Sequence, residues 1–458
     1  MTRTPPQADS TMFALLLLLF LLLPPFAQPA SKPLTLTLTR TSSTTPGSPA
    51  DPWTKLSLLA SSSLARAHRL KRRHHHHHHQ AAELGPDAAV DSTVSVSPHS
   101  SGEYALTLSF GTPPQPLNLS LDTSSSLAWF PCTERFRCPN CPSSSSGIPY
   151  FVPKSSSSAR FFGCTDPKCR WIHRRVPSNC SSAPASCPPF FLISGGGING
   201  GGLLLSETLS LAGKQVAGFA VGCSVFSDHQ PIGVAAFGRG PPSLPYQLGA
   251  GSFSYCLPSH RLDDAPGAKG ALVLGADPLA GNGLTFTPFV KNPAGSGAYY
   301  YLGLDAITVG GVAVRVTPLG PGGDGGAIVD TGTSFTVVEA GVHEQLVAEF
   351  TRQVRNYRRA TSTEARSSLR PCFDVTGQKT VTLPEMALRF EGGAIMRLPL
   401  KNYFSFVGET DAVCLTVVGG GGDGGPAVVL GNFQQQDLYM VFDADRERLG
   451  FRQQTCNA

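Results

Sequence analysis

From residue 102 onward, short apolar segments alternate with polar positions and are separated by Gly, Pro and Ser. The clearest of these segments are Tyr104–Phe110, Leu117–Leu121, Ala271–Leu274, Tyr300–Val309 and Val381–Phe390. Together with 49 glycines and 39 prolines, this texture predicts mainly antiparallel β structure. Helical spacing is scarce, and the best case is Ala340–Tyr357, whose apolar residues recur at three- and four-residue intervals. We therefore expect an all-β fold with a few short helices.

An internal repeat organises this part of the chain. Ser120–Phe130 reads SLDTSSSLAWF and Ala327–Val337 reads AIVDTGTSFTV, so each is an apolar strand that runs into Asp-Thr and small hydroxyl residues. In each half a later apolar strand ends in glycine, 116 residues after the first aspartate and 101 residues after the second. Such a repeat predicts two similar lobes that each contribute one carboxylate to a shared cleft.

Two aspartates held close together cannot both ionise cheaply, so the pair keeps one proton into the acidic range. The ionised carboxylate can then take a proton from a bound water while the protonated one donates to a scissile carbonyl oxygen. This chemistry needs no metal and no cofactor. A lone Asp-Thr-Gly is more simply an Asx-type turn, but two copies at matching positions favour a catalytic pair at Asp122 and Asp330.

The neighbouring residues suit such a pair. We expect the hydroxyls of Thr123 and Thr331 to bond backbone groups of the opposite loop and so hold the two loops together. Ser125 and Thr333 stand where a hydroxyl can bond the outer carboxylate oxygens.

The chain resembles a pepsin-type aspartic protease of the plant, nepenthesin-like branch, over about Glu103–Arg452. The match is carried by FGTPPQPLNLSLDTSSSLAWFPC, GLLLSETLSL, PIGVAAFGRGPPSLPYQL, FSYCL, AIVDTGTSFTVV and VVLGNFQQQDLYMVFDADRERLGF. The resemblance implies a bilobal, all-β fold, endopeptidase activity at acidic pH and a propeptide removed on activation. It implies the dyad Asp122 and Asp330, with supporting residues Thr123, Ser124, Ser125, Thr331, Gly332, Thr333 and Trp129.

Two positions depart from that family. Ser124 stands where the family has glycine, at the floor of the cleft, where a side chain can crowd the site. In the hairpin flap, Ser194 aligns with the expected tyrosine and precedes Gly195 and Gly196. The indole N–H of Trp129 would then need another partner or water, and Phe190 or Phe191 could supply only an apolar contact. Looser substrate alignment would lower turnover.

These departures keep an alternative open. A relative of the same fold could act as a non-catalytic binding or inhibitory protein, as the plant xylanase inhibitors that resemble this fold do. Retention of both aspartates favours the protease. A disulfide-rich structural wall protein would explain the cysteines but not the paired loops.

The N-terminal segment predicts export. Phe13–Leu23 is wholly apolar and too short to span a bilayer, but it suits a secretory signal peptide. Residues 1–98 carry nine Lys/Arg and five Asp/Glu, so they hold +4 of the total net charge of +5. The basic run Arg66–Arg73 precedes six histidines, and the sequence does not decide whether these histidines are native or a tag.

We divide the chain into a signal peptide (1–30), a basic propeptide or flexible leader (31–98), an N-terminal lobe with a Cys-rich insert (99–290) and a C-terminal lobe (291–458).

The cysteine content and the charge of the chain indicate its compartment and its class of partner. Twelve cysteines in an exported chain favour disulfides over a zinc cluster at Cys132, Cys138 and Cys141. The near-neutral body argues against nucleic acid as a partner. We expect a monomer without a stable membrane anchor that acts on polypeptides in the apoplast or the vacuole. Asn118 and Asn179 begin N-glycosylation sequons, and Asn179 is the more accessible because Asn118 falls in a strand.

Overall fold

The computed structural model describes residues 34–40, 52–83, 93–94, 103–139, 141, 148–173, 185–194, 197–211, 214–228, 230, 232–259, 269–275, 283–293, 298–406, 411–420 and 424–456. The expected signal peptide, Asn179, Gly195 and Gly196 lie outside these residues. Among the described residues the largest sheet has fifteen strands. In spatial order they are β13 (Thr285–Pro288), β27 (Arg448–Gln453), β26 (Leu438–Asp443), β11 (Ser252–Cys256), β12 (Lys269–Leu274), β1 (Leu34–Arg40), β3 (Tyr104–Phe110), β4 (Gln115–Asp122), β10 (Gly233–Ala236), β5 (Trp129–Pro131), β9 (Lys214–Ser227), β8 (Gly197–Leu211), β7 (Phe190–Ser194) and β2 (Thr93–Val94), with β6 (Arg160–Phe161) paired to β8.

Three smaller sheets belong to the second half of the chain. The first runs β14 (Tyr301–Leu302), β17 (Ala327–Val329), β25 (Val428–Leu430), β18 (Thr336–Glu339) and β24 (Val417–Gly420). The second runs β16 (Val312–Arg315), β15 (Leu304–Val309), β20 (Met386–Phe390) and β21 (Ile395–Arg397), and the third β19 (Cys372–Asp374), β23 (Ala412–Leu415) and β22 (Phe404–Phe406). Because most pairings are antiparallel, the sequence prediction of a mainly antiparallel β fold is confirmed.

The repeat seen in the sequence is a repeat of parallel strand pairs. In the first half β10 lies parallel to β4, with Ala236 opposite Asp122. In the second half β25 lies parallel to β17, with Leu430 opposite Val329. The glycine after each later strand allows a close approach to the aspartate loop. A Cβ on Gly238 would lie 2.6 Å from the Ser125 carbonyl oxygen, and one on Gly431 would lie 2.5 Å from that of Ser334.

Within the described residues, one helix is long and the other helices are short and few. The short ones are α3 (Cys169–Ile172), α4 (Leu244–Gln247), α6 (Thr361–Ser367) and the 3₁₀ turns η1 (Pro153–Ser155), η4 (Leu400–Asn402) and η5 (Asn432–Gln435). The amphipathic segment predicted at 340–357 forms α5 (Ala340–Gln353), which buries Val342, Leu346, Val347 and Phe350. The strand expected at 381–390 begins only at Met386. Pro384 has no N–H to donate to a ladder, which accounts for the shorter strand.

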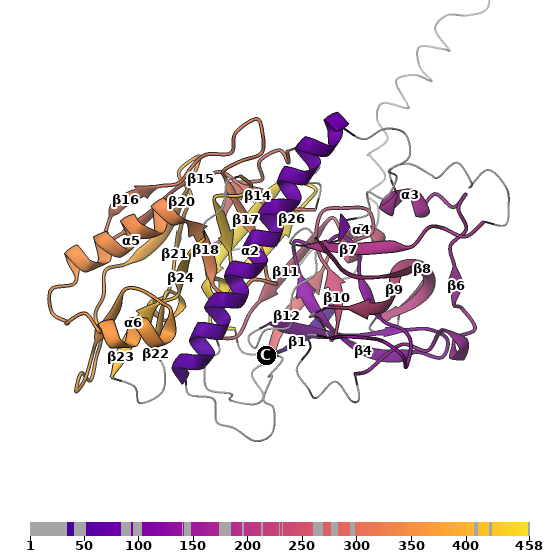
Figure 1. Ribbon diagram of the computed structural model, residues 1–458, viewed down its shortest axis with the longest axis horizontal. Coiled ribbons are helices and arrows are strands. Elements are labelled where there is room, and N and C mark those ends of the chain that lie inside the picture. Colours follow the sequence, from indigo (N-terminus) through magenta and orange to yellow (C-terminus); the bar gives the residue numbers. More distant parts are fainter. Residues whose placement is uncertain are drawn as a thin grey trace, which may run out of the picture. The chain divides into compact units, whose positions relative to one another are not determined.

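The longest helix was not predicted. Within the segment expected to form a propeptide or flexible leader, residues 52–83 form the helix α2 (Pro52–Glu83). Buried residues recur along one side of α2 every three or four positions: Trp53, Leu56, Ala60, Ser63, Ala67 and Leu70. They pack against Tyr301, Phe335, Val418 and other residues of the second half. In Figure 1, α2 crosses the centre of the described part of the chain, between the orange and the magenta elements. It contacts α6, β18 and β24 on one side and β7 on the other.

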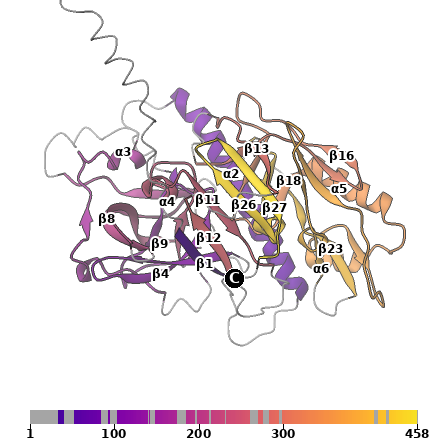
Figure 2. The same cartoon turned by 180° about the vertical axis from the view of Figure 1, so that it is seen from behind.

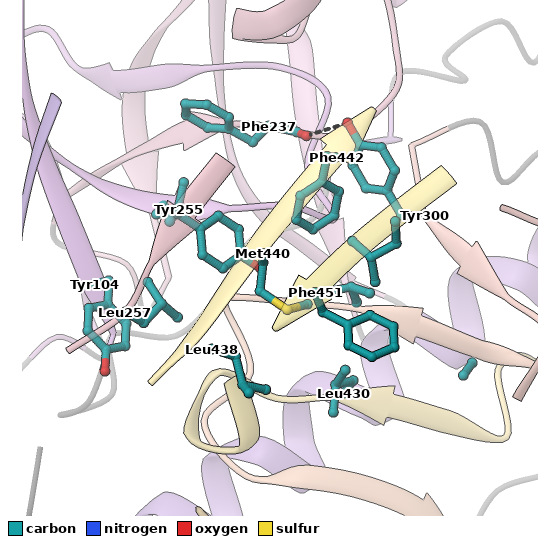
Figure 3. Close-up of a cluster of buried hydrophobic side chains, with 14 of the residues drawn as sticks. Tyr104, Phe237, Tyr255, Leu257, Tyr300, Leu430, Leu438, Met440, Phe442 and Phe451 are labelled. Carbon is teal, nitrogen blue, oxygen red and sulfur yellow. Dashed lines mark hydrogen bonds between the residues drawn. The ribbon is translucent and has the colours of Figure 1, made fainter. Parts of the chain in front are cut away.

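Aromatic side chains from both halves share a core. Figure 2, the view from behind, shows the yellow strands β26 and β27 beside β11 and β12. Phe442 of β26 stacks on Phe253 of β11 with ring centroids 4.5 Å apart. Figure 3 shows Phe442 and Met440 near Tyr255, and the Tyr300 hydroxyl donating to the Phe237 carbonyl at 3.0 Å. Since β26 comes from the end of the chain, this core joins the two halves.

Disulfides connect distant segments. Pairs in which both cysteines belong to the described residues are Cys132–Cys223, Cys138–Cys141, Cys169–Cys187, Cys256–Cys456 and Cys372–Cys414. The preference for disulfides over a zinc cluster at the first three cysteines is therefore confirmed. Within the described ranges, no helix combines the length and the apolar character needed to cross a bilayer.

Candidate active site

Two Asp-Thr loops meet at the junction between the halves. Asp122 ends β4 and Asp330 follows β17, and both side chains are almost completely buried, with 1% and 0% exposed. The threonines cross-link the loops. The Thr123 hydroxyl donates to the Val329 carbonyl at 3.0 Å, and the Thr331 hydroxyl donates to the Leu121 carbonyl at 2.8 Å. Each hydroxyl also accepts the other threonine's backbone N–H at 3.1 Å. These four bonds fix the separation of the two aspartates.

Each carboxylate has an inner and an outer oxygen, with different partners. The inner oxygen Oδ1 of Asp122 accepts the Ser124 backbone N–H at 2.9 Å, and that of Asp330 accepts the Gly332 N–H at 3.1 Å. The outer oxygen Oδ2 accepts a hydroxyl in both cases. Ser125 donates to Asp122 at 2.7 Å, and Thr333 donates to Asp330 at 2.5 Å. The two halves thus surround their aspartates in the same way.

Ser124 adds a contact that its counterpart, Gly332, cannot make. Its Oγ lies 3.0 Å from Oδ1 of Asp122 and 3.1 Å from Oδ1 of Asp330, so one hydroxyl lies within hydrogen-bonding distance of both inner oxygens. The residue is fully buried and is not among the residues with positive φ, so its side chain imposes no left-handed backbone strain. The aspartates therefore lie close together with serine in place of glycine.

The guanidinium of Arg66 lies between the two carboxylates. Nε and Nη2 bind Asp330 in a bidentate manner, at 2.6 Å to Oδ2 and 2.8 Å to Oδ1. Nη2 also lies 3.0 Å from both oxygens of Asp122. Arg66 comes from α2 and is only 2% exposed. A cation thus occupies the place where a reacting water and peptide bond would have to lie.

Electrostatics follow from this placement. Burial by itself raises the pKa of Asp330, but the charge and hydrogen bonds of Arg66 outweigh it, so the pKa is lowered. Burial would lower the pKa of Arg66, yet the two aspartates raise it above its ordinary value. Arg69 lies three residues after Arg66 on the same helix. Its burial and its repulsion from Arg66 lower the pKa of Arg69 to about 9. With α2 in place, the charge of Arg66 therefore favours the ionised form of Asp330.

Trp129 and the strands of the expected flap, β7 and β8, belong to the same large sheet. Trp129, on β5, is fully buried, and among the described residues its indole N–H has no hydrogen-bond partner. Phe190 of β7 belongs to the same apolar cluster, and both residues approach the position that a Cβ on Gly222 would take. Ser194 ends β7, where it pairs with Gly197 of β8. An apolar contact is thus present where the resemblance implied a tyrosine hydroxyl.

Sequence reasoning missed Arg66. It lies within the basic run that we assigned only to a leader. The signal that could have revealed it is the apolar spacing from Trp53 to Leu70, which predicts a helix.

Of the two expected glycosylation sites, Asn118 is exposed on β4 and its side chain accepts a hydrogen bond from Thr107 at 2.7 Å.

Comparison with known proteins places this geometry in a family. Residues 104–276 match the family described as xylanase inhibitor N-terminal, and residues 299–453 match xylanase inhibitor C-terminal. A probable aspartyl protease of Arabidopsis thaliana is 33% identical, with 78% of this chain and 83% of the relative covered. The aspartic proteinase nepenthesin-2 of Nepenthes gracilis is 29% identical, with 78% of each covered.

A solved structure supports the fold. The basic 7S globulin from soybean superposes with a TM-score of 0.60 at 21% identity, covering 81% of this chain and 96% of the globulin. At this identity the likeness establishes the bilobal, pepsin-like architecture alone. The family models match both halves of the chain, and the curated relatives are aspartyl proteases. The chain therefore belongs to the pepsin-like aspartyl protease family of plants.

Proposed function

We propose that this chain is an aspartic endopeptidase made as a zymogen, with α2 as its inhibitory segment. One observation carries the proposal: a single guanidinium, from Arg66, binds both buried carboxylates. Arg66 precedes residue 104, where the match to the family begins. A segment outside the matched residues 104–276 and 299–453 therefore covers the groups that would perform the reaction, which is the arrangement expected of an inactive precursor.

The proposed reaction begins when α2 leaves and the carboxylate pair takes up one proton from the acidic solvent. A water then takes the place of Nη2 between Asp122 and Asp330. The ionised carboxylate accepts a proton from this water, and the oxygen of the water attacks the carbonyl carbon of the scissile peptide bond. The protonated carboxyl donates its proton to the carbonyl oxygen, which gives a neutral tetrahedral intermediate. One hydroxyl of the intermediate then returns its proton to the carboxylate that donated it, the other carboxyl protonates the nitrogen, and the C–N bond breaks to release the carboxylic acid and the amine. The proposed reaction uses no covalent intermediate and no metal.

Supporting roles follow from the contacts. Thr123 and Thr331 position the loops, while Ser125 and Thr333 stabilise the outer carboxylate oxygens. We assign Trp129 to the wall of the cleft, below a flap formed by β7 and β8. Polypeptides are the proposed substrates. We place the protein in the secretory pathway, on its way to the apoplast or the vacuole. We further propose that it is a monomer and that the sequons at Asn118 and Asn179 accept glycans.

The test is cleavage of a denatured protein substrate by the full chain after acid activation. We expect cleavage between about pH 3 and 5, inhibition by a statine-type transition-state mimic, and loss of cleavage in Asp330→Asn. Cleavage that survives in Asp330→Asn indicates a contaminating protease. No cleavage at any pH from about 3 to 7, after α2 has been released, would overturn the proposal and favour a non-catalytic binding protein.

A further inference from the structure

The hydroxyl of Ser124 contacts Arg66 as well as the aspartates. Nη2 of Arg66 donates to Ser124 Oγ at 2.8 Å, as short as its bond to Asp330 and shorter than its two contacts with Asp122. Ser124 is fully buried. Three charged groups, from α2 and from both catalytic loops, therefore converge on one neutral oxygen.

Counting hydrogens shows what this oxygen supplies. Nη2 carries two hydrogens and faces four oxygens, two of Asp122, one of Asp330 and Oγ of Ser124. Oγ can accept one of those hydrogens while donating its own to one inner carboxylate oxygen. The hydroxyl thus links the cation to the dyad by a donor–acceptor chain. A glycine, as at Gly332 in the second loop, offers the same backbone bond but no such link.

The surroundings make this link effective. Arg66 is 2% exposed and Ser124 is fully buried, so free access of water does not offset loss of the hydroxyl. Nη1 of Arg66 has no hydrogen-bond partner within the described ranges, so the guanidinium depends on Nε and Nη2 alone. Of these two nitrogens, only Nη2 contacts Asp122.

We infer that Ser124 is a positioning residue for the inhibitory helix: its hydroxyl anchors Arg66 between the two aspartates. The inference rests on the proposed role of α2 as the inhibitory segment. It gives a function to the residue that departs from the family's glycine. Ser124 strengthens the closed state of the precursor, beyond any crowding of the cleft. A hydrogen bond to a charged group that is lost without replacement corresponds to roughly 10- to 100-fold in the opening equilibrium of α2.

The experiment measures opening of α2 in the full chain by amide hydrogen exchange at neutral pH, where exchange reports the opening equilibrium. The proteins are the parent, Ser124→Ala, Ser124→Gly, Arg66→Ala and the double variant Arg66→Ala with Ser124→Ala. Ser61→Ala is the matched control, because Ser61 lies on the exposed side of the same helix and its hydroxyl donates to the Ser57 carbonyl, away from the aspartates. Exchange in α5 serves as the internal reference.

We expect Ser124→Ala and Ser124→Gly to accelerate exchange in α2 by about 10- to 100-fold, with α5 and Ser61→Ala unchanged. In the Arg66→Ala background, Ser124→Ala should add less than about threefold, since its partner is already gone. Unchanged exchange in both Ser124 variants overturns the inference. An equal acceleration with and without Arg66 also overturns it, because a general loosening of the loop would act in either background.

This measurement does not depend on proteolysis. A chain that cleaves nothing can still show coupling between Ser124 and Arg66, in which case the inference stands and only the proposed activity fails. An active protease without coupling overturns the inference and leaves the activity in place. If Ser124→Ala does not fold, Ser124→Gly carries the same comparison, since it restores the residue type of the second loop.

Discussion

Nε of Arg66 lies 2.6 Å from Oδ2 of Asp330, although 264 positions separate the two residues. The contact joins the leader to the loop that ends β17, and through Nη2 it reaches Asp122 in the other half. The guanidinium of Arg66 lies between the two buried carboxylates, in the space that a substrate of the proposed reaction would need. The following predictions test the consequences of this contact and of the structure around it.

Removing the cation should open the active site. Arg66→Ala leaves two carboxylates buried opposite an empty space, which disfavours docking of α2 by about 3–5 kcal/mol. We expect the uncleaved variant to bind a statine-type mimic at neutral pH, whereas the parent does not. Calorimetry on the uncleaved chain measures this. His68→Ala, on the exposed side of α2, is the control and should behave like the parent.

Acid should release α2. The pKa of Asp330 is lowered while Arg66 is docked, so the docking contributes stability above the ordinary aspartate pKa of about 3.9 and loses it as the pH falls through the lowered value. We expect α2 to become sensitive to limited proteolysis below about pH 4 and to remain protected at pH 6. Protection of α2 that does not decline at any pH below about 4 would contradict the assignment of Arg66 as the cation that holds α2 in place.

The threonine cross-links should stabilise the junction. Thr331→Val keeps the shape but removes the bond to the Leu121 carbonyl and leaves the Thr123 N–H without an acceptor. We expect a loss of about 2–4 kcal/mol in the free energy of unfolding, measured by urea titration. Thr107→Val, on the exposed side of β3, is the comparison and should change stability by less than about 0.5 kcal/mol. Similar losses in both variants would argue against a special role for the cross-link.

The stability that a disulfide contributes should depend on the length of the loop that it closes. Cys256 and Cys456 are 200 positions apart, whereas Cys138 and Cys141 are three apart. Because a cross-link restricts the unfolded chain more when its loop is longer, we expect replacing the first pair by alanine to cost about 2–5 kcal/mol and replacing the second to cost less. Thermal unfolding of the two double variants checks the order.

Several features could be read from local pattern. The amphipathic spacing that begins at Ala340 predicted α5, and the segment 104–110 predicted β3, since such patterns reflect one apolar side facing a core. The two Asp-Thr motifs located the aspartates. The strand that we expected from Val381 begins only at Met386 in the structure. The prediction followed the apolar alternation and gave too little weight to Pro384.

Other features required the three-dimensional arrangement. The sequence indicated that Ser124 replaces a glycine and suggested crowding. Only the structure showed its hydroxyl between two carboxylates and a guanidinium. The sequence also placed Arg66 in a basic run without distinguishing it from its neighbours.

The sequence by itself determined the class of fold, the repeat and the two carboxylates, because strand periodicity and the Asp-Thr motifs depend on neighbouring residues. The tertiary structure decided which cation lies between those carboxylates and which hydroxyl holds it there. Such contacts join residues from three distant segments, and their strength comes from shared burial away from water, which no local pattern records.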